Sequence, residues 1–205
     1  MQKTILHLCA DIGSDSTPYR DAGYNVICIG KEIGVENYMP PNNVYGVIAN
    51  PVCTEFSVAS KGFHQQGDYE KGMFLVNHCL RIIKECKPVF WALENPATGR
   101  LKQFLGKPQY EYEPWWFGSP WTKKTALWGK FNMPQRIYND WQEVPKNDNL
   151  YIRPSRNKPS MAQFHKSAIE YIPEFARFKD AVKNNMSFRS LCSQGFAKAF
   201  FEVNK

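Results

Sequence analysis

The sequence predicts an α/β protein with a mostly parallel, twisted sheet and flanking helices. A strand–turn–helix–strand unit opens the chain, further short apolar strands follow, and a long amphipathic stretch separates two of them. The 205 residues, 43% of them apolar, can bury the core of one domain. Aromatic residues make up 15% of the chain, and this supply of packing groups argues against disorder.

The opening unit is defined by its apolar runs and its turn residues. Residues 4–9 predict a strand, and the turn after it contains Gly13. Residues 16–23 predict a short helix, because Pro18 suits its first turn and Gly23 suits its C-cap. Residues 25–29 predict the second strand, and strands joined through a helix in this way run parallel.

The later elements are predicted from hydrophobic periodicity. Residues 44–49 and 89–93 are apolar runs typical of buried strands. Residues 68–86 carry the strongest helical stripe in the chain. The remaining predictions are a short strand near 118–129, an irregular proline-rich segment over 130–165, and helices over 173–183 and 195–203.

Charge and composition limit the partners. The 26 basic and 19 acidic residues leave a formal charge of +7, which permits a polyanion such as nucleic acid. No apolar run approaches the length of a membrane span and no leader is recognisable, so we expect no membrane partner. Six cysteines without a CxxC pair favour a reducing, cytoplasmic setting. Four histidines lack metal-ligand spacing, so we expect no metal and interpret them as structural or solvated: His7, His64, His78 and His165.

Polar or reactive residues lie at four predicted strand ends. In an open parallel sheet, ligands bind outside the carboxyl ends of the strands, so we expect these groups to converge. The turn at Gly13 could cradle a nucleoside-containing cofactor, although many such turns bind nothing. The four groups are Asp11 to Ser14, Cys53 to Ser57, Glu94 to Asn95, and Lys123 to Thr125.

Cys53 is the candidate nucleophile, because it follows a strand into a loop. The alternative is a buried, inert thiol, which is the commoner fate of a cysteine. That inert role is expected for the cysteines inside predicted strands and the long helix: Cys9, Cys28, Cys79 and Cys86.

Glu94 is the candidate proton donor. It ends an apolar run, where its carboxyl could have a raised pKa, and pairing with Arg100 or helix capping is the alternative. A nucleophile beside a protonated carboxyl is a usable catalytic couple. The segment from Trp115 to Lys124 mixes tryptophans with lysines, which suits phosphate and a stacked base, or is surface charge over a core.

Five segments resemble, in the same order, motifs of the C5-cytosine DNA methyltransferases. Residues 6–14 with Ala22-Gly23-Tyr24 line up on the first cofactor motif, LDLFAGIGG…AGF. Residues 50–57 (NPVCTEFS) resemble the nucleophile motif GPPCQxFS. Two more matches are Glu94-Asn95-Pro96 with Glu-Asn-Val, and residues 118–125 plus Gly129 with GxPQxRxR…G. The last is Gly195-Phe196-Ala197 with Gly-Asn-Ala/Ser.

This resemblance covers most of residues 4–129 and the last ten, and it extends to small methylase-like proteins of phages and mobile elements. It implies a Rossmann-like fold that binds S-adenosylmethionine and transfers its methyl group to C5 of cytosine in DNA. Cys53 would attack C6 and Glu94 would hydrogen-bond or protonate N3. Asn95 would orient the loops, while Lys123 and Thr125 would replace the family's two arginines. The implied cofactor-binding residues are Asp11, Ile12, Gly13, Ser14, Glu32, Pro51, Gly195 and Ala197.

The resemblance also divides the chain. Residues 1–129 would form the methyltransferase-like core, and 188–205 a helix that returns to it. Residues 130–187 would form a reduced, irregular subdomain in place of a target-recognition domain, so a partner protein could supply target recognition.

Several positions depart from the family pattern. Asp11 replaces the first glycine of the cofactor loop and Ser14 the last, His7 stands where Asp is usual, and Val52 replaces the proline before the cysteine. Two alternatives therefore stay open: a catalytically silent protein that binds nucleic acid or another protein, and an enzyme that acts on RNA or a nucleotide.

Overall fold

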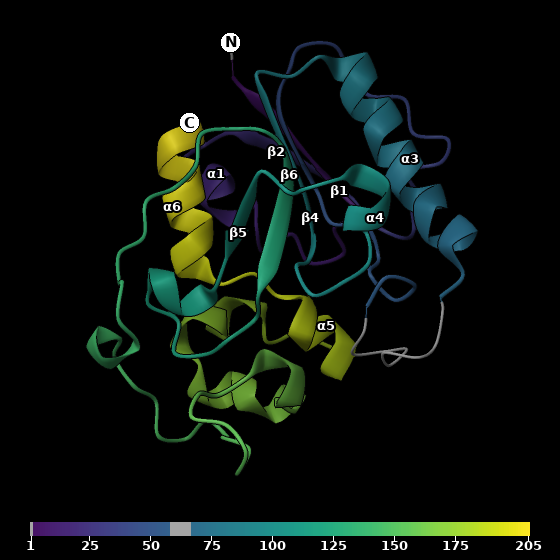
Figure 1. The fold of residues 1–205 in the computed structure, drawn as a ribbon. Helices are drawn as coiled ribbons and strands as arrows, with labels where there is room; N and C mark the ends of the chain where they lie inside the picture. Colours follow the sequence, from purple (N-terminus) through teal and green to yellow (C-terminus); the bar gives the residue numbers. More distant parts are fainter. Residues whose placement is uncertain (1, 58–66) are drawn as a thin grey trace.

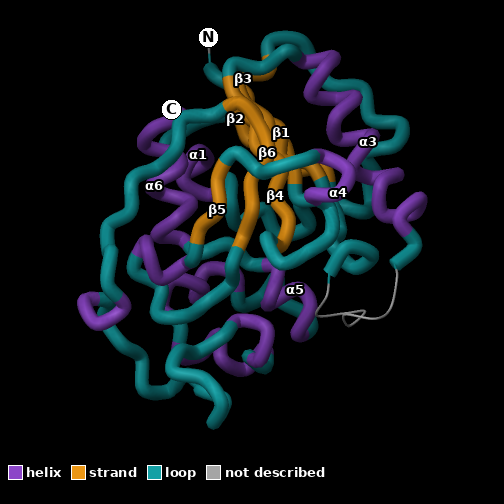
Figure 2. The backbone as a smooth tube through the Cα atoms, in the orientation of Figure 1, coloured by secondary structure: helices purple, strands orange, loops and turns teal. Residues whose placement is uncertain are grey.

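A mixed six-stranded sheet forms the centre of the protein in the computed structural model, which describes residues 2–57 and 67–205. The strand order is β2-β1-β3-β4-β6-β5, and five of the strands point the same way while β6 runs antiparallel to both neighbours. Figures 1 and 2 show the sheet between two helical layers. The strands are β1 (Thr4–Leu8), β2 (Asn25–Ile29), β3 (Val44–Ala49), β4 (Phe90–Pro96), β5 (Tyr110–Tyr112) and β6 (Thr125–Lys130).

Most helices in the described residues are short. The described residues contain α1 (Thr17–Asp21), α3 (Tyr69–Cys86), α4 (Lys102–Leu105), α5 (Asn185–Ser190) and α6 (Gln194–Asn204), of which only α3 and α6 exceed two turns. Short 3₁₀ segments lie between them: η1 (Pro114–Phe117), η2 (Trp141–Glu143), η3 (Met161–Gln163), η4 (Lys166–Tyr171) and η5 (Pro173–Phe178).

The long helix α3 begins and ends where local chemistry requires. The Asp68 side chain accepts a hydrogen bond from the Lys71 amide at its start, and Lys87 adopts a left-handed conformation at its end. Val76 and Ile83 lie on the buried stripe that the periodicity predicted. Leu80 and Met73 pack only partly against that core.

Two apolar cores lie on opposite faces of the sheet. The first includes Leu6, Val47 and Leu93 and is covered by α3. The second includes Ile5, Ile48 and Phe200 and is covered by α1 and α6, which lie side by side in Figure 1. Neighbouring strand residues alternate between the two cores, as the pleat of a strand requires.

The topology locates a crevice in the sheet. After β1 the chain adds β2 on one side and then β3 on the other, so the order reverses between β1 and β3. Ligands of open α/β sheets bind outside the carboxyl ends of the strands at such a reversal. The loops that begin at Cys9 and Asn50 leave the sheet at this point.

Residues beneath this edge form a third cluster around the buried Trp121, Phe175 and Phe188. These segments lie below the sheet in Figure 1. Ile12, from the loop after β1, packs partly against the cluster, so this loop connects the sheet with the third cluster.

Several elements differ from the sequence predictions. The expected helix over 173–183 is a 3₁₀ segment over Pro173–Phe178. Glu94 and Asn95 lie inside β4, because β6 pairs with them, rather than beyond its end. No helix within residues 2–57 and 67–205 is long and apolar enough to cross a membrane.

Candidate active site

The loop that carries Cys53 is held in place from two directions. The Cys53 carbonyl accepts hydrogen bonds from the amides of Phe56 (3.0 Å) and Ser57 (2.8 Å), which close a tight turn. Asn95, only 1% exposed, donates from Nδ2 to the Pro51 carbonyl at 3.0 Å. Val52, between them, is 53% exposed. The loop is therefore anchored to the end of β4 on one side and open to solvent on the other.

Cys53, Glu94 and Lys123 lie close enough to influence one another electrostatically. Burial raises the pKa of the Cys53 thiol, the negative charge of Glu94 raises it further, and Lys123 lowers it. Burial also raises the pKa of the Glu94 carboxyl, against the opposing effect of Lys123. The thiol and the carboxyl, which are 41 positions apart in the sequence, thus share one polar environment with a lysine.

Lys123 reaches this place from the strand end before β6. Its Nζ donates to the carbonyl of Leu191 at 3.1 Å, at the end of α5, and its backbone amide donates to Glu113 at 2.8 Å. A cation at a helix C-terminus is favourable, because the last carbonyls lack partners. Thr125, the other candidate from this segment, is buried and donates back to the Lys123 carbonyl.

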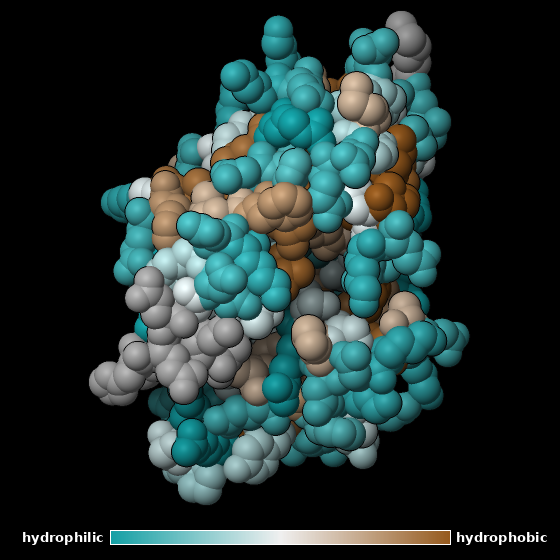
Figure 3. Space-filling model, turned by 90° about the vertical axis from the view of Figure 1, so that its right-hand side faces the viewer, coloured by the Kyte–Doolittle hydropathy of each residue, from teal (hydrophilic) through white to brown (hydrophobic). Residues whose placement is uncertain are grey.

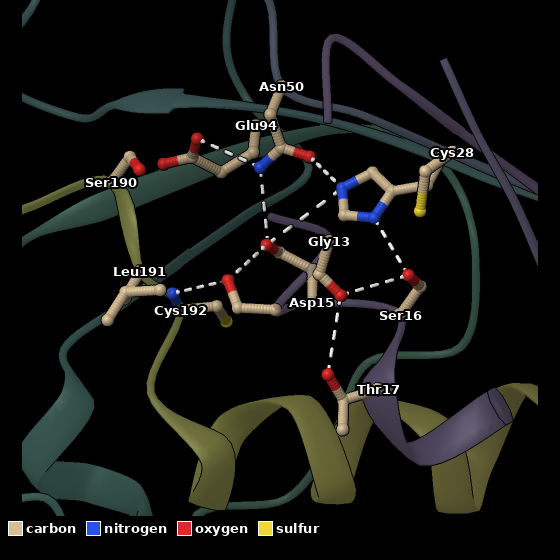
Figure 4. A network of polar contacts seen from close by, with 12 residues as sticks. Gly13, Asp15, Ser16, Thr17, Cys28, Asn50, Glu94, Ser190, Leu191 and Cys192 are labelled. Carbon is tan, nitrogen blue, oxygen red and sulfur yellow. Dashed lines mark hydrogen bonds and ion pairs between the residues drawn. The ribbon is translucent and has the colours of Figure 1, made fainter. Parts of the chain in front are cut away.

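A polar network extends from Glu94 to the loop after β1 (Figure 4). Asn50 Nδ2 donates to Glu94 Oε2 at 3.3 Å and to Asp15 Oδ1 at 3.2 Å. Asn50 Oδ1 lies 2.8 Å from His7 Nε2. Ser14 donates to Asp15 and accepts from the backbone amide of Cys192, which links the network to the segment before α6.

Both ring nitrogens of His7 have polar partners. Nε2 faces the amide oxygen of Asn50, so it carries a proton. Nδ1 lies 2.8 Å from the Ser16 hydroxyl, which lies 3.1 Å from the Gly13 carbonyl. Burial lowers the pKa of His7, but Cys28 and Asp15 more than offset this and the net direction is upward.

The loop after β1 is shaped around Gly13. Its φ of +73° lies in the region that favours glycine, and a Cβ at this position would stand 2.8 Å from Cys28 Sγ. The space beside Gly13 is thus occupied by a thiol of this chain. Ser14 is also engaged, since its carbonyl accepts from Gln194 Nε2.

The other residues implied as cofactor-binding fall into two groups. Asp11 and Glu32 are exposed at the ends of β1 and β2, and Asp11 Oδ1 accepts from the Lys31 amide at 2.8 Å. Pro51 and Ala197 are buried, and a Cβ on Gly195 would stand 2.1 Å from the Phe117 carbonyl, so Gly195 is where α6 packs on η1. Ile12 is half-buried against the third cluster.

Cys28 differs from the inert thiol that the sequence predicts. Arg20 Nη2 lies 3.3 Å from its Sγ. Burial raises the pKa of Cys28, but His7 and Arg20 outweigh burial and bring the pKa below its ordinary value. Cys9 is also not isolated, because its Sγ lies 3.7 Å from that of Cys79.

Sequence reasoning missed part of the site. The sequence predicts no separate role for Asp15 or Asn50, and His7, predicted to be structural or solvated, is buried and hydrogen-bonded to Asn50. The available signal is a polar side chain inside one apolar strand, at His7, and another directly after a second apolar strand, at Asn50. His64 lies outside the described residues. No cluster of metal-ligating side chains occurs in the part of the chain that the structure describes.

Figure 3 shows one face of the protein that is hollowed near its middle, with hydrophobic groups on the walls of the hollow. A small cavity with room for about one water lies under the network and is lined in part by Asp15, Glu94 and Ala197.

Comparison with known proteins gives limited matches. No protein-family model matches the chain. No curated protein matches it in sequence either. A solved E. coli protein, provisionally described as a DNA modification methyltransferase encoded within a prophage, is similar with 14% identity and a TM-score of 0.42. The match covers 82% of this chain and 54% of that protein, so this chain spans about half its length.

Proposed function

We propose that this protein transfers a methyl group from S-adenosylmethionine to C5 of cytosine in DNA, with Cys53 as the nucleophile and Glu94 as the acid at N3. The observation that carries the proposal is the shared environment of the Cys53 thiol, the Glu94 carboxyl and Lys123. Cys53 follows β3, Glu94 lies in the second half of β4 and Lys123 precedes β6, at the edge where sheets of this kind bind ligands.

The residue types suit the chemistry. In the proposed reaction the Cys53 thiol loses its proton and forms an S–C6 bond, while Glu94 hydrogen-bonds or protonates N3 and stabilises the charge that develops on the ring. When bound, S-adenosylmethionine supplies an electrophilic methyl group, which C5 accepts. Loss of the C5 proton and cleavage of the S–C6 bond then release Cys53. A cytosine within a duplex must first be flipped out, at a cost of a few kcal/mol.

The charges of Cys53 and Glu94 are coupled in a direction that favours this chemistry. The negative charge of Glu94 is one cause of the raised pKa of Cys53, so the thiolate forms more readily while Glu94 is protonated. The same protonated Glu94 is the form that donates to N3. Lys123 favours the thiolate and could meet a phosphate or the base, whereas its charge opposes the protonation of Glu94, which burial favours.

The cofactor loop fits S-adenosylmethionine in part. The exposed carboxyls of Asp11 and Glu32 stand at adjacent strand ends and suit the hydroxyl and amino groups of a nucleoside cofactor. The loop does not leave an open glycine cradle, because other parts of the protein pack against Gly13, Ser14 and Gly195. Any contact of these three residues with the cofactor would be made by their backbone. We propose Asp11 and Glu32 as the main polar contacts.

A second surface suits the nucleic acid. We define the tryptophan face as Trp115, Trp116 and Trp141 with the cations that lie over their rings, Arg136, Lys146 and Lys158. Arg136 stands 3.2 Å from the Trp116 ring centre and Lys158 stands 4.5 Å from that of Trp115. Indole rings that alternate with cations can stack bases and neutralise phosphates. The exposed Arg153 and Arg156 precede Lys158 in the same loop.

A catalytically silent, nucleic-acid-binding protein is the second candidate. The packing of Cys28 against Gly13 favours it, because this contact fills space that a cofactor could use. A silent protein would keep the tryptophan face and have no use for the coupling between Cys53 and Glu94.

Covalent trapping separates the two candidates. The protein is incubated with S-adenosylmethionine and DNA that contains 5-fluorocytosine, in which C5 cannot lose a proton and the S–C6 bond persists. We expect an adduct on Cys53, its loss in Cys53→Ser, and its retention in Cys86→Ser, a half-buried cysteine of α3. Parallel reactions use RNA and free 5-fluorodeoxycytidine triphosphate. An adduct on one of these instead of DNA would reassign the substrate, and no adduct on any of them would refute the enzyme.

A further inference from the structure

Two polar residues, one in β1 and one directly after β3, contact each other through their side chains. His7 lies in β1 and Asn50 directly follows β3, and their Nε2 and Oδ1 atoms are 2.8 Å apart. His7 is 1% exposed. The pair therefore bridges the two strands between which the sheet order reverses.

This contact determines the orientation of the Asn50 amide. With Oδ1 bound by His7, Nδ2 is directed at two carboxyl groups, Asp15 Oδ1 and Glu94 Oε2. An amide nitrogen has two hydrogens, so each carboxyl can take one. The opposite orientation would place the amide oxygen against both carboxyl groups.

The Asn50 amide in turn distinguishes the two oxygens of Glu94. In a protonated carboxyl group the carbonyl oxygen is the better hydrogen-bond acceptor and the hydroxyl oxygen carries the proton. Nδ2 binds Oε2, and no described residue donates a hydrogen bond to Oε1. Figure 4 shows the second oxygen directed away from Asn50, toward the side of Ser190.

We propose that the His7–Asn50 pair positions Glu94, by holding Nδ2 on Oε2 so that the acid proton stands on Oε1. Asn50 and His7 are positioning residues, since they act through Glu94. The proposed consequence for catalysis rests on the function proposed above, whereas the orientation of the Glu94 carboxyl does not.

The test is the titration of Glu94 in the intact protein, followed by infrared spectroscopy of its protonated carboxyl band and assigned with Glu94→Gln. Asn50→Ala removes a donor that favours the carboxylate, so we expect the midpoint of Glu94 to move to higher pH. The variant keeps the other charged or titratable groups around Glu94, although His7 and Asp15 lose their hydrogen bonds to Asn50. These groups are Lys123, Asp15, His7, Cys53, Tyr112 and Cys192.

The rate of covalent trapping provides the second readout. In Asn50→Ala the proton can stand on either oxygen, so we expect trapping to slow by about 10- to 100-fold. Its alkaline limb should nevertheless move to higher pH together with Glu94. A purely structural role would slow the reaction with no such shift.

Two further variants keep the test decisive. His7→Gln retains an N–H for Asn50 Oδ1 but removes the charge of His7, which lowers the pKa of Glu94. It should keep most of the wild-type trapping rate and raise the Glu94 midpoint less than His7→Leu, which should also slow trapping as Asn50→Ala does. Asn50→Ser accompanies Asn50→Ala in case the latter does not fold. Asn204→Ala, which removes a buried asparagine of α6 outside the site, should leave the midpoint unchanged.

The outcomes separate the two proposals. A Glu94 midpoint that is the same in folded Asn50→Ala, Asn50→Ser and wild type would refute the positioning role. A shifted midpoint in a protein that traps no nucleic acid would support the orientation of Glu94 and refute the proposed reaction.

Discussion

Asn95 Nδ2 donates a 3.0 Å hydrogen bond to the carbonyl of Pro51, and so ties the end of β4 to the loop that carries Cys53. The contact spans 44 positions of sequence. It joins the two segments from which the candidate nucleophile and the candidate acid come. A substitution at Asn95 should therefore change the mobility and the accessibility of Cys53.

Substitution of Asn95 should therefore loosen the Cys53 loop. Asn95→Ala leaves a buried carbonyl without its donor, which costs about 1–3 kcal/mol of unfolding free energy. We expect this loss in urea denaturation, together with faster alkylation of Cys53. Asn95→Asp, which turns an acceptor toward the Pro51 carbonyl, should be at least as unstable. Wild-type stability in both variants would show that the bond is dispensable.

Gly13 and Gly23 form a matched pair for testing the loop after β1. Both have positive φ, +73° and +81°, but a Cβ on Gly13 meets Cys28 Sγ at 2.8 Å while one on Gly23 meets nothing within 4 Å. Gly23→Ala should cost about 1–2 kcal/mol for the backbone alone, and Gly13→Ala more.

A double-mutant cycle isolates the extra loss. Cys28→Ala removes the neighbouring sulfur, so Gly13→Ala should be less destabilising in the Cys28→Ala background than in the wild type. Equal losses in the two backgrounds, measured by urea denaturation, would contradict the packing of Gly13 against Cys28.

Cys28 should ionise at lower pH than Cys53, although the sequence predicts Cys53 to be the reactive thiol and Cys28 to be inert. His7 and Arg20 lower the pKa of Cys28 despite burial, whereas burial and Glu94 raise that of Cys53. Alkylation by iodoacetamide, quantified by peptide mass spectrometry across pH, should give a lower midpoint for Cys28. Arg20→Gln should raise that midpoint and leave Cys53 unchanged. The reverse order of midpoints would show that these charges are arranged differently.

Glu94→Gln should stabilise the protein at neutral and alkaline pH. Burial raises the pKa of Glu94 above its ordinary value of 4.5, so the fold favours the neutral form. The stability that this provides is complete below pH 4.5 and is lost as pH rises through the folded-state pKa. The gain in Tm for Glu94→Gln should thus grow with pH. Each kcal/mol gained in the free energy of unfolding should raise Tm by about 2–4 °C. A gain that is constant with pH would contradict the raised pKa.

The tryptophan face should contribute to nucleic-acid affinity. Stacking of one base on an aromatic ring is worth about 1–3 kcal/mol, so Trp141→Ala should weaken binding of single-stranded DNA by about 5- to 150-fold. Fluorescence anisotropy at fixed salt measures the change. Phe74→Ala, an exposed aromatic of α3, is the control and should bind normally. Equal affinity of Trp141→Ala and wild type would place the nucleic acid elsewhere.

Local patterns predicted the sheet well and the polar network poorly. The apolar runs at 4–9, 25–29, 44–49 and 89–93 became β1 to β4, because period and composition are properties of a few adjacent residues. The contact between Ser14 and Cys192 joins residues 178 positions apart, and nothing near either residue encodes it. Likewise, the charges that lower the pKa of Cys28 become neighbours only when β1, α1 and β2 assemble.

Some misplacements have a specific cause. Glu94 was expected beyond its strand because the apolar run ends at Leu93, but pairing with β6 extends β4 to Pro96. The helix expected over 173–183 is a 3₁₀ segment that ends at Phe178. Its two buried residues, Phe175 and Phe178, pack into the third cluster, and the residues after them present no apolar stripe that would bury a longer helix. In both cases tertiary contacts override a local preference.

The position of α6 bears on how the chain acquires its structure. Tyr19 and Asn204 are joined by a hydrogen bond across 185 positions, and Phe200 and Phe201 complete the aromatic packing around Tyr19 and Phe90. α1 alone covers only part of this face of the sheet until α6 docks, so folding depends on closing a very long loop and should be slower than in a helical bundle of similar size. A chain truncated before residue 191 would display that aromatic face to solvent and should aggregate.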